Sequence, residues 1–153
     1  LSGKGHHEML ALTLGNIDAG PTLVRVQMGS VLGDVFGARH GTRLIANEAM
    51  QRIEQEGKGV ILYIPPRGDL VSDLDYHMGR VAERPAPAHE IVLREVGFGS
   101  QVLMDLGVRK MRLITNTPSR IVAVDGFDLE IVEQVLLRAP TASDADSAPR
   151  TTH

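Results

Sequence analysis

Polar side chains follow the carboxyl end of one clearly patterned strand. The segment Val108 to Ile114 is typical of a strand, with Met111 and Leu113 on one face, and the polar run Thr115-Asn116-Thr117 comes directly after it. In open α/β sheets, ligands bind in the crevice outside the carboxyl ends of strands. Hydroxyl and amide groups at that place could bind a ligand, but the same residues are also typical of an ordinary turn. The pattern leaves both interpretations open.

A second group of candidate side chains lies in the segment from residue 67 to residue 89. Its carboxylates and imidazoles are possible metal ligands: Asp69, Asp73, Asp75, His77 and His89. Their spacing is irregular, however, and Ser72-Asp73 better fits the start of a short helix, where an aspartate is favoured near the positive end of the dipole. We therefore expect a capped helix with solvated charges. The adjacent His6 and His7 are likewise expected to be solvated.

Composition excludes several classes of chemistry. The chain has no cysteine, so disulfides, thiolate metal ligands and cysteine nucleophiles are absent. Its net charge is −3, and only 3% of its residues are aromatic, so neither a basic field nor stacking platforms favour nucleic acid. No apolar run approaches the roughly 20 residues of a membrane span, and no signal peptide is visible. We expect a cytoplasmic protein with no nucleic-acid or membrane partner.

The elements that position these side chains predict a single α/β domain, in which helices flank a mixed sheet. We expect this domain at residues 9–138, between a flexible segment at 1–8 and a disordered tail at 139–153. The strands are predicted at Met9–Leu14, Thr22–Met28, Val60–Ile64, Val108–Ile114 and Leu129–Val135, and the first two are expected to form a hairpin. The helices are predicted at Leu44–Glu56, Gly99–Leu106 and Ser119–Val124. Gly29–Arg43 is predicted to be a loop, and Gly107 a left-handed helix end.

Several of these segments occur together, and in the same order, in one known family. They are L-A-L-T-L-G-N-I from Leu10, R-V at Arg25, G-D-V-F-G from Gly33, E-G-K-G-V-I-L-Y from Glu56, the long run Leu93 to Pro118, and V-E-Q-V-L-L near the end. The chain thus resembles GTP cyclohydrolase II of riboflavin biosynthesis over nearly all of Leu10 to Leu137. That family often forms the second half of a fusion with 3,4-dihydroxy-2-butanone 4-phosphate synthase, and a start at Leu1 fits a domain cut from such a fusion.

The resemblance implies a zinc-dependent hydrolase that opens the imidazole ring of GTP, releases formate and removes pyrophosphate. In the family, three cysteine thiolates hold the zinc, whose bound water attacks the purine. The first cysteine falls on Ser30 of this chain, and the other two fall within His40 to Arg43. No cysteine stands at these positions, and a hydroxyl with one imidazole binds zinc far more weakly than three thiolates do. We expect no zinc cofactor here.

The ligand-binding positions of the family are partly retained. Arg94 stands at the position of the proposed nucleophile, although the acidic base two residues earlier is replaced by Val92. The family's R-Q-E-G-R, which contacts GTP, is replaced by P-P-R-G-D, which puts Arg67 and Asp69 at charge-swapped positions. The remaining candidate ligand-binding residues are Arg25, Thr115 and Arg120, with Tyr76 as a candidate for the family's active-site tyrosine. Without the resemblance, Arg94 would be read as a surface arginine on a helix.

Three functional interpretations follow. The first is a degenerate, non-catalytic domain that assists a fused or neighbouring synthase as a structural or regulatory element. The second is an active hydrolase with altered chemistry, acting on GTP or another phosphate ester through Arg94, Thr115 and Arg120. The third is a binding module unrelated to riboflavin. The resemblance also implies a homodimer.

Overall fold

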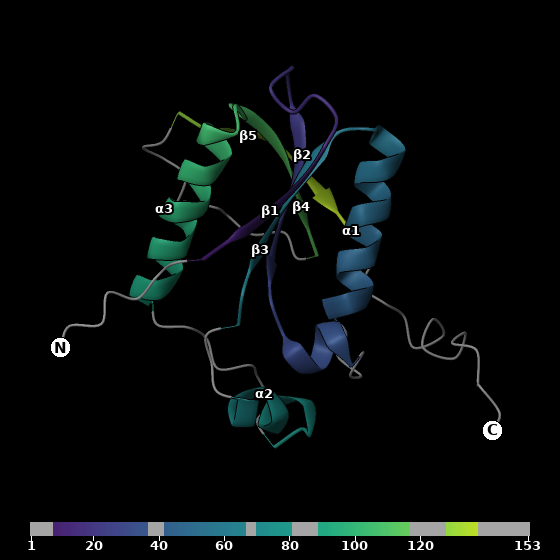
Figure 1. Ribbon diagram of the computed structural model, residues 1–153, viewed down its shortest axis with the longest axis vertical. Coiled ribbons are helices and arrows are strands. Elements are labelled where there is room, and N and C mark those ends of the chain that lie inside the picture. Colours follow the sequence, from purple (N-terminus) through teal and green to yellow (C-terminus); the bar gives the residue numbers. More distant parts are fainter. Residues whose placement is uncertain (1–7, 37–41, 67–69, 81–88, 117–127, 138–153) are drawn as a thin grey trace.

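The computed structural model describes residues 8–36, 42–66, 70–80, 89–116 and 128–137. These residues form a mixed five-stranded sheet with a long helix on each face (Figure 1). The elements, in chain order, are β1 (Leu10–Leu14), β2 (Thr22–Met28), the π-helix η1 (Val31–Val35), α1 (Thr42–Glu56), β3 (Gly59–Ile64), α2 (Leu70–His77), α3 (His89–Asp105), β4 (Lys110–Thr115) and β5 (Glu130–Leu136). The predicted α/β class and mixed sheet are confirmed.

β3 lies inside the sheet, between β1 and β2. The strand order is β1-β3-β2-β4-β5; β1 is antiparallel to β3, whereas the β2–β3, β2–β4 and β4–β5 pairs are parallel. The predicted hairpin between the first two strands is therefore wrong. Nearly every residue of β3 is buried, whereas most of β1 is exposed. A strand that is buried on both faces favours the interior of a sheet, and the more exposed strand takes the edge.

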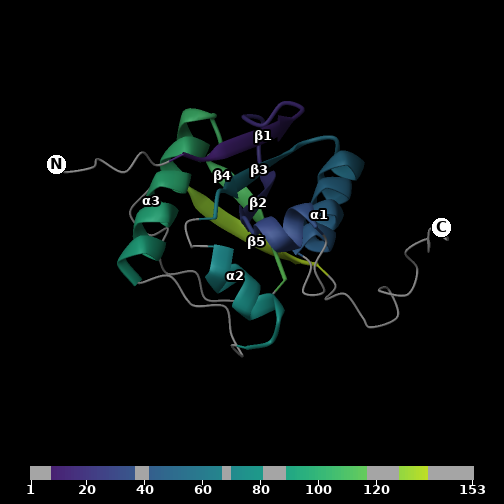
Figure 2. The same cartoon turned by 60° about the horizontal axis from the view of Figure 1, so that its bottom comes forward.

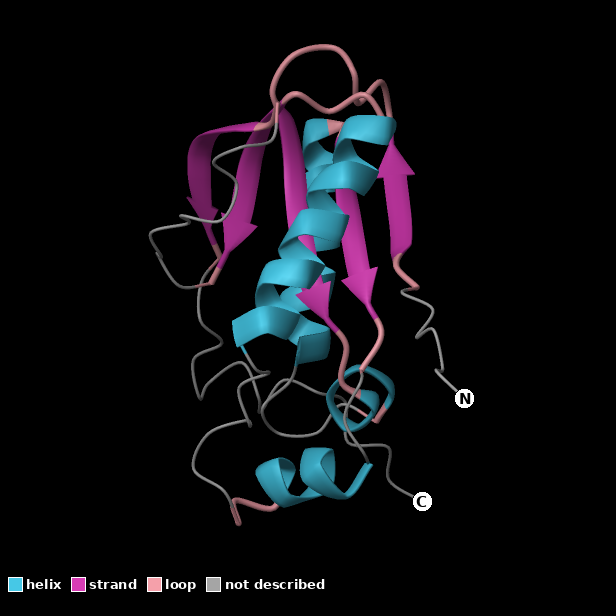
Figure 3. Cartoon of the chain, turned by 90° about the vertical axis from the view of Figure 1, so that its left-hand side faces the viewer, coloured by secondary structure: helices cyan, strands magenta, loops and turns pink. Residues whose placement is uncertain are grey.

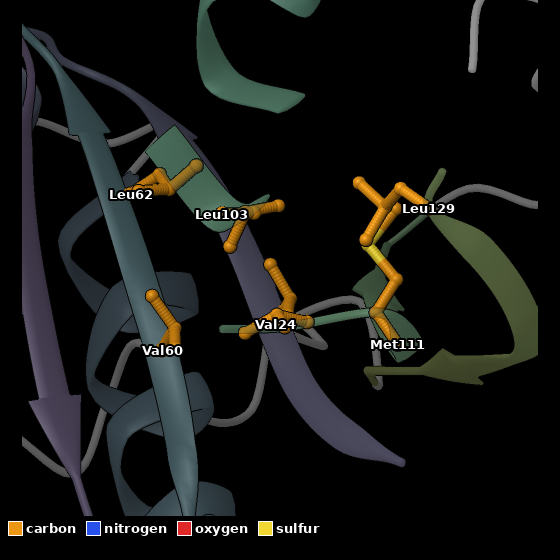
Figure 4. Packing of buried hydrophobic residues seen from close by; sticks show 7 residues of the cluster. Val24, Val60, Leu62, Leu103, Met111 and Leu129 are labelled. Atoms are coloured by element: carbon orange, nitrogen blue, oxygen red, sulfur yellow. The ribbon is translucent and has the colours of Figure 1, made fainter. Parts of the chain in front are cut away.

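Two hydrophobic clusters hold the helices against the sheet. On one face, Leu103 of α3 packs with sheet residues such as Val24 and Leu62, as Figure 4 shows. On the other face, Ala49 and Ile53 of α1 pack against a second cluster of strand residues, which consists of Leu23, Ile61, Ile114 and Val135. Figure 3 shows the resulting layers, with α3 in front of the sheet and α1 behind it.

The helix α3 is longer than predicted. It begins at His89 rather than Gly99 and passes without a break through Gly97 and Gly99. A glycine costs about 1 kcal/mol in a helix relative to alanine, which led to the shorter prediction. A Cβ atom on Gly99 would lie at an ordinary contact distance of 3.6 Å from Leu62 Cδ1, so this part of α3 packs against the sheet. Tertiary packing therefore offsets the weak local propensity.

Glycine ends both long helices, and the predicted left-handed end at Gly107 is confirmed. Gly107 has a φ of 93°, and Gly57, after α1, has a φ of 75°. After α3, the amide of Gly107 donates to Met104 O at 3.0 Å and the amide of Val108 donates to Leu103 O at 2.9 Å. This pair of hydrogen bonds is the Schellman motif, which satisfies the last carbonyl groups of a helix.

The remaining boundaries agree with the prediction to within a few residues, with two exceptions. The Gly29–Arg43 segment was expected to be a loop, but part of it forms η1, because Ser30 caps that turn by accepting from Gly33 N. The helix expected near Ser72-Asp73 exists and begins two residues earlier, at Leu70. The predicted helix Ser119–Val124 and the predicted terminal segments, apart from Glu8, lie outside the described residues. Among the described helices, none has the length and hydropathy needed to cross a membrane.

Candidate functional site

The carboxyl ends of β2, β3 and β4 meet at one edge of the sheet because the three strands run in parallel. η1 follows β2 at this edge, and α2 lies beyond the strand ends, outside the layers formed by α1 and α3 (Figures 1 and 3). Figure 2, turned so that this end comes forward, shows α2 in front of the strands. The predicted polar residues after β2 and β4 therefore belong to the same end of the domain.

Ser30 is the centre of a buried polar cluster at this edge. It follows β2, and its relative exposure is 0%. Its hydroxyl lies 3.0 and 3.1 Å from the two carboxylate oxygens of Asp73, 3.2 Å from His77 Nε2 and 3.0 Å from the amide nitrogen of Gly33. A serine hydroxyl has one donor and two acceptor sites. All three are used when Ser30 donates to Asp73 and accepts from Gly33 N–H and His77 Nε2–H.

Two carboxylates bracket Ser30 from opposite directions. Asp34, in η1, accepts the Ser30 amide at 2.7 Å and the Tyr63 hydroxyl at 3.2 Å. Asp73, in α2, accepts the Leu32 amide at 3.2 Å in addition to the Ser30 hydroxyl. The side chains of Asp73 and His77 are only 9% and 7% exposed. We call Ser30, Asp73 and His77 the latch, because these side chains join α2 to the loop after β2.

The latch contains the three residue types of a serine-hydrolase triad but not its geometry. In a triad, the serine contacts one ring nitrogen of the histidine and the aspartate contacts the other. Here Ser30 Oγ lies 3.2 Å and Asp73 Oδ1 lies 3.6 Å from the same atom, His77 Nε2. The hydroxyl is also fully buried, so a substrate cannot reach it. The arrangement supports structural anchoring rather than nucleophilic catalysis.

The latch residues do not fit the zinc site that the family resemblance implies. The resemblance assigns Ser30 to the first thiolate position, and its hydroxyl already contacts Asp73, His77 and the Gly33 amide within the domain. Asp73 and His77 are conventional zinc ligands, but a zinc site uses at least three protein ligands. Among the described residues, no group of three His, Cys, Asp or Glu side chains could hold a metal. His40 lies outside the described residues, and the side chain of Arg43 is not described.

Arg25 forms a second polar cluster on the neighbouring strands. Its Nε and Nη2 donate to Gln27 Oε1 at 3.2 and 3.1 Å, and its Nη1 donates to Ile114 O at 3.2 Å and to Asn116 Oδ1 at 3.3 Å. The residue is 9% exposed, and burial lowers the pKa of its guanidinium from the ordinary value. In the described part of the chain, these partners are all neutral. Arg25 is therefore a buried cation beside Asn116 of the predicted polar loop.

The other predicted site residues are only partly placed. Thr115 ends β4, where its carbonyl oxygen accepts from Leu137 N at 2.9 Å. Arg94 belongs to α3, but its side chain is not described. Arg67, Asp69 and Arg120 lie outside the described residues. The structure thus brings Arg25 to Asn116 of the polar loop.

Among the possible metal ligands whose side chains the structure describes, Asp73 and His77 are the pair that it brings together. Asp75 points elsewhere and forms a 3.0 Å ion pair with Arg80; Asp69 lies outside the described residues, and the side chain of His89 is not described. The prediction of solvated charges is wrong for Asp73 and His77, whose side chains are only 9% and 7% exposed. Their four-residue spacing, which puts both on one helical face, was the available signal.

Comparisons with known proteins agree with the resemblance. A family model described as GTP cyclohydrolase II matches residues 2–136. A riboflavin biosynthesis protein RibBA of Bacillus cereus strain ATCC 14579 is 39% identical, over 92% of this chain and 38% of that protein. RibBA of Bacillus mycoides strain KBAB4 is 39% identical, over 90% of this chain and 37% of that protein. The chain therefore spans less than two fifths of these relatives.

A solved structure resembles the fold as well. It is the crystal structure of RibBX, described as a two domain 3,4-dihydroxy-2-butanone 4-phosphate synthase from A. baumannii. The TM-score is 0.54 at 28% sequence identity, and the alignment covers 86% of this chain and 32% of that chain. This chain is thus similar to about one third of a larger protein.

Proposed function

The chain belongs to the GTP cyclohydrolase II family of riboflavin biosynthesis, and we propose that it is a member that no longer opens the ring of GTP. In this proposal, it serves instead as a structural or regulatory partner of a 3,4-dihydroxy-2-butanone 4-phosphate synthase. Water needs strong polarisation to attack a purine carbon at neutral pH, and in the family zinc supplies it by lowering the pKa of its bound water to about 7.

One observation carries the proposal: the latch occupies the first metal-ligand position of the family. Ser30 is fully buried there, and its hydroxyl is engaged by Asp73, His77 and the Gly33 amide. To bind a cation, Ser30 would have to give up hydrogen bonds that join α2 to the domain. The role beside a synthase is supported by the similar chain named as a two domain synthase, in which the matched part is 32% of the length.

Formate release tests the loss of the reaction. The purified chain, supplied with Zn²⁺ and GTP, is expected to release formate no faster than the Ser30→Ala variant does. An active GTP cyclohydrolase II, assayed in parallel, is the positive control. Zinc-dependent formate release at an enzymatic rate by the wild-type chain alone would contradict the proposal.

Synthase activity tests the partner role. The synthase of the same organism is measured alone and joined to this chain, and we expect its activity or thermal stability to differ between the two forms. Identical activity and stability would remove the proposed role. A homodimer of this chain is part of the same proposal, and light scattering of the purified protein measures it directly.

A second candidate function is binding of a phosphorylated ligand. Arg25 favours it, because a buried guanidinium whose described partners are all neutral leaves its positive charge available to an anion. Thr115, Arg94 and Arg120 are proposed to contribute to the same site, together with Arg67 and Asp69. A ligand at 100 times its Kd stabilises a protein by about 2.7 kcal/mol. A thermal-shift series with GTP, other nucleotides and sugar phosphates therefore detects it, and the absence of any shift would rule it out.

A further inference from the structure

The helix α2 is oriented opposite to the usual arrangement in a folded domain. A surface helix normally turns its apolar stripe toward the core and its polar face toward water. In α2, the polar side chains of Asp73 and His77 face the domain and are 9% and 7% exposed. The apolar side chains on the adjacent face are between 41% and 64% exposed: Leu70, Val71, Leu74 and Met78.

These four side chains form a continuous stripe, which we call the α2 stripe. Leu70, Leu74 and Met78 follow one another at intervals of four residues, and Val71 lies three residues before Leu74, so all of them share one helical face. Met78 extends the helix by donating its amide to Leu74 O at 2.8 Å. Val35 and Phe36, in and directly after the neighbouring η1, are also exposed, at 64% and 72%. Six exposed apolar side chains of the described residues thus lie at this end of the domain.

The latch is what turns the stripe outward. Asp73 and His77 are four residues apart on the helical face adjacent to the α2 stripe, and both contact Ser30. α2 has no residue that is buried as a whole. The hydrogen bonds that join α2 to Ser30 and Leu32 are polar, and α2 lies beyond the strand ends (Figures 1 and 3), with the α2 stripe 41% to 64% exposed.

We propose that the α2 stripe docks into an apolar groove on the synthase domain with which this chain works. This inference rests on the proposed function and names the surface that serves it. The mode is that of an amphipathic helix whose apolar side chains enter a groove on the partner. The exposed stripe supplies the apolar anchors, and the latch holds them in a fixed direction before binding.

The size of the stripe favours a tethered synthase domain over a second copy of this chain. A helix of eight residues is about 12 Å long, whereas a stable interface between freely diffusing proteins buries roughly 800 Å² and 20–30 residues on each side. The α2 stripe with Val35 and Phe36 falls well short of that. A small patch is sufficient when the partner is joined to the same chain, since a short linker gives an effective concentration of about millimolar. The similar RibBX and RibBA chains are more than twice as long as the part that matches.

Amide hydrogen exchange tests the inference. The chain is compared alone and joined at its amino end to the 3,4-dihydroxy-2-butanone 4-phosphate synthase of its own organism. We expect the amides of residues 72–78 to exchange at least tenfold more slowly in the joined protein. Leu74→Ser should abolish this difference, because it removes the central apolar side chain without touching the latch. Val132→Ser is the matched control, because Val132 is 42% exposed on β5 and should leave the difference unchanged.

The outcomes separate the docking surface from the proposed function. Equal exchange of α2 in the free and joined proteins, or protection that survives Leu74→Ser, overturns the docking surface. Protection in the free chain that rises with its concentration also overturns it, because the occupant is then a second copy. If the joined domain still changes synthase activity while α2 is unprotected, only the docking surface is wrong and the proposed function stands. If the domain changes neither activity nor stability of the synthase, the proposed function itself fails.

Discussion

Replacing Asp73 with alanine tests whether the latch anchors α2. In the native domain, the Asp73 carboxylate accepts the Ser30 hydroxyl and the Leu32 amide, and its side chain is only 9% exposed. A hydrogen bond to a charged group contributes about 1.5–3 kcal/mol, and buried donors left without an acceptor add a desolvation penalty. Since one donor is Ser30, directly before η1, and the other is Leu32 within η1, the loss falls on the domain itself. We expect the free energy of unfolding to fall by about 2–4 kcal/mol.

The matched control is Asp75→Ala in the same helix. Asp75 pairs with Arg80 at 3.0 Å, but the side chains are 33% and 61% exposed, and such surface pairs contribute about 0–1 kcal/mol. Urea denaturation and thermal unfolding, both followed by circular dichroism, measure both variants. For a domain of this size, 1 kcal/mol corresponds to about 2–4 °C in Tm, so the two melting curves should separate clearly. If Asp73→Ala is no more destabilising than Asp75→Ala, the anchoring role of the latch is refuted.

Three further changes test other parts of the structure. Leu62→Ala should lower the free energy of unfolding by about 2–5 kcal/mol, because Leu62 is fully buried against α3. Leu12→Ala, on the exposed edge strand β1, should lower it by well under half as much, and denaturant titration compares the two variants. Gly107→Ala should lower the free energy of unfolding by at least about 1–2 kcal/mol, because a φ of 93° disfavours a residue with a side chain and a Cβ atom would lie 3.0 Å from Asp18 Cβ. Unchanged stability would contradict the left-handed helix end at Gly107. Arg25→Met should abolish any thermal shift produced by a phosphorylated ligand; a shift of undiminished size would place that ligand elsewhere.

The local sequence pattern predicted most of the helices and strands, but it did not predict which strands are neighbours in the sheet. The alternation in β2 predicted Thr22–Met28 to the residue, and the glycines after α1 and α3 marked both helix ends. β3 lies between β1 and β2 because it pairs with strands that are distant in the sequence. The short separation of β1 and β2 in the sequence led instead to the prediction of a hairpin. The length of α3 depends on packing over Leu62, which compensates for the glycines that the pattern counted against the helix.

The candidate site was predictable as a set of positions but not as a set of contacts. Ser30 was identified through the family's metal-ligand motif, and Asp73 through its place near a helix start. Their contact joins residues that are 43 positions apart, and Arg25 meets Asn116 across 91 positions. No periodicity encodes such pairs. The apolar stripe of α2 was visible in the sequence, yet its outward direction follows only from the polar contacts of Asp73 and His77 with the domain.

Zinc titration tests the central claim, that the first metal-ligand position of the family has become a hydrogen-bonded anchor. The wild-type chain and Ser30→Ala are titrated calorimetrically with Zn²⁺ after metal removal, and formate is measured from the same samples with GTP. We predict no stoichiometric zinc that depends on Ser30 and no formate from either protein. One zinc per chain that is retained by the wild type, lost in Ser30→Ala and accompanied by formate release would contradict the claim.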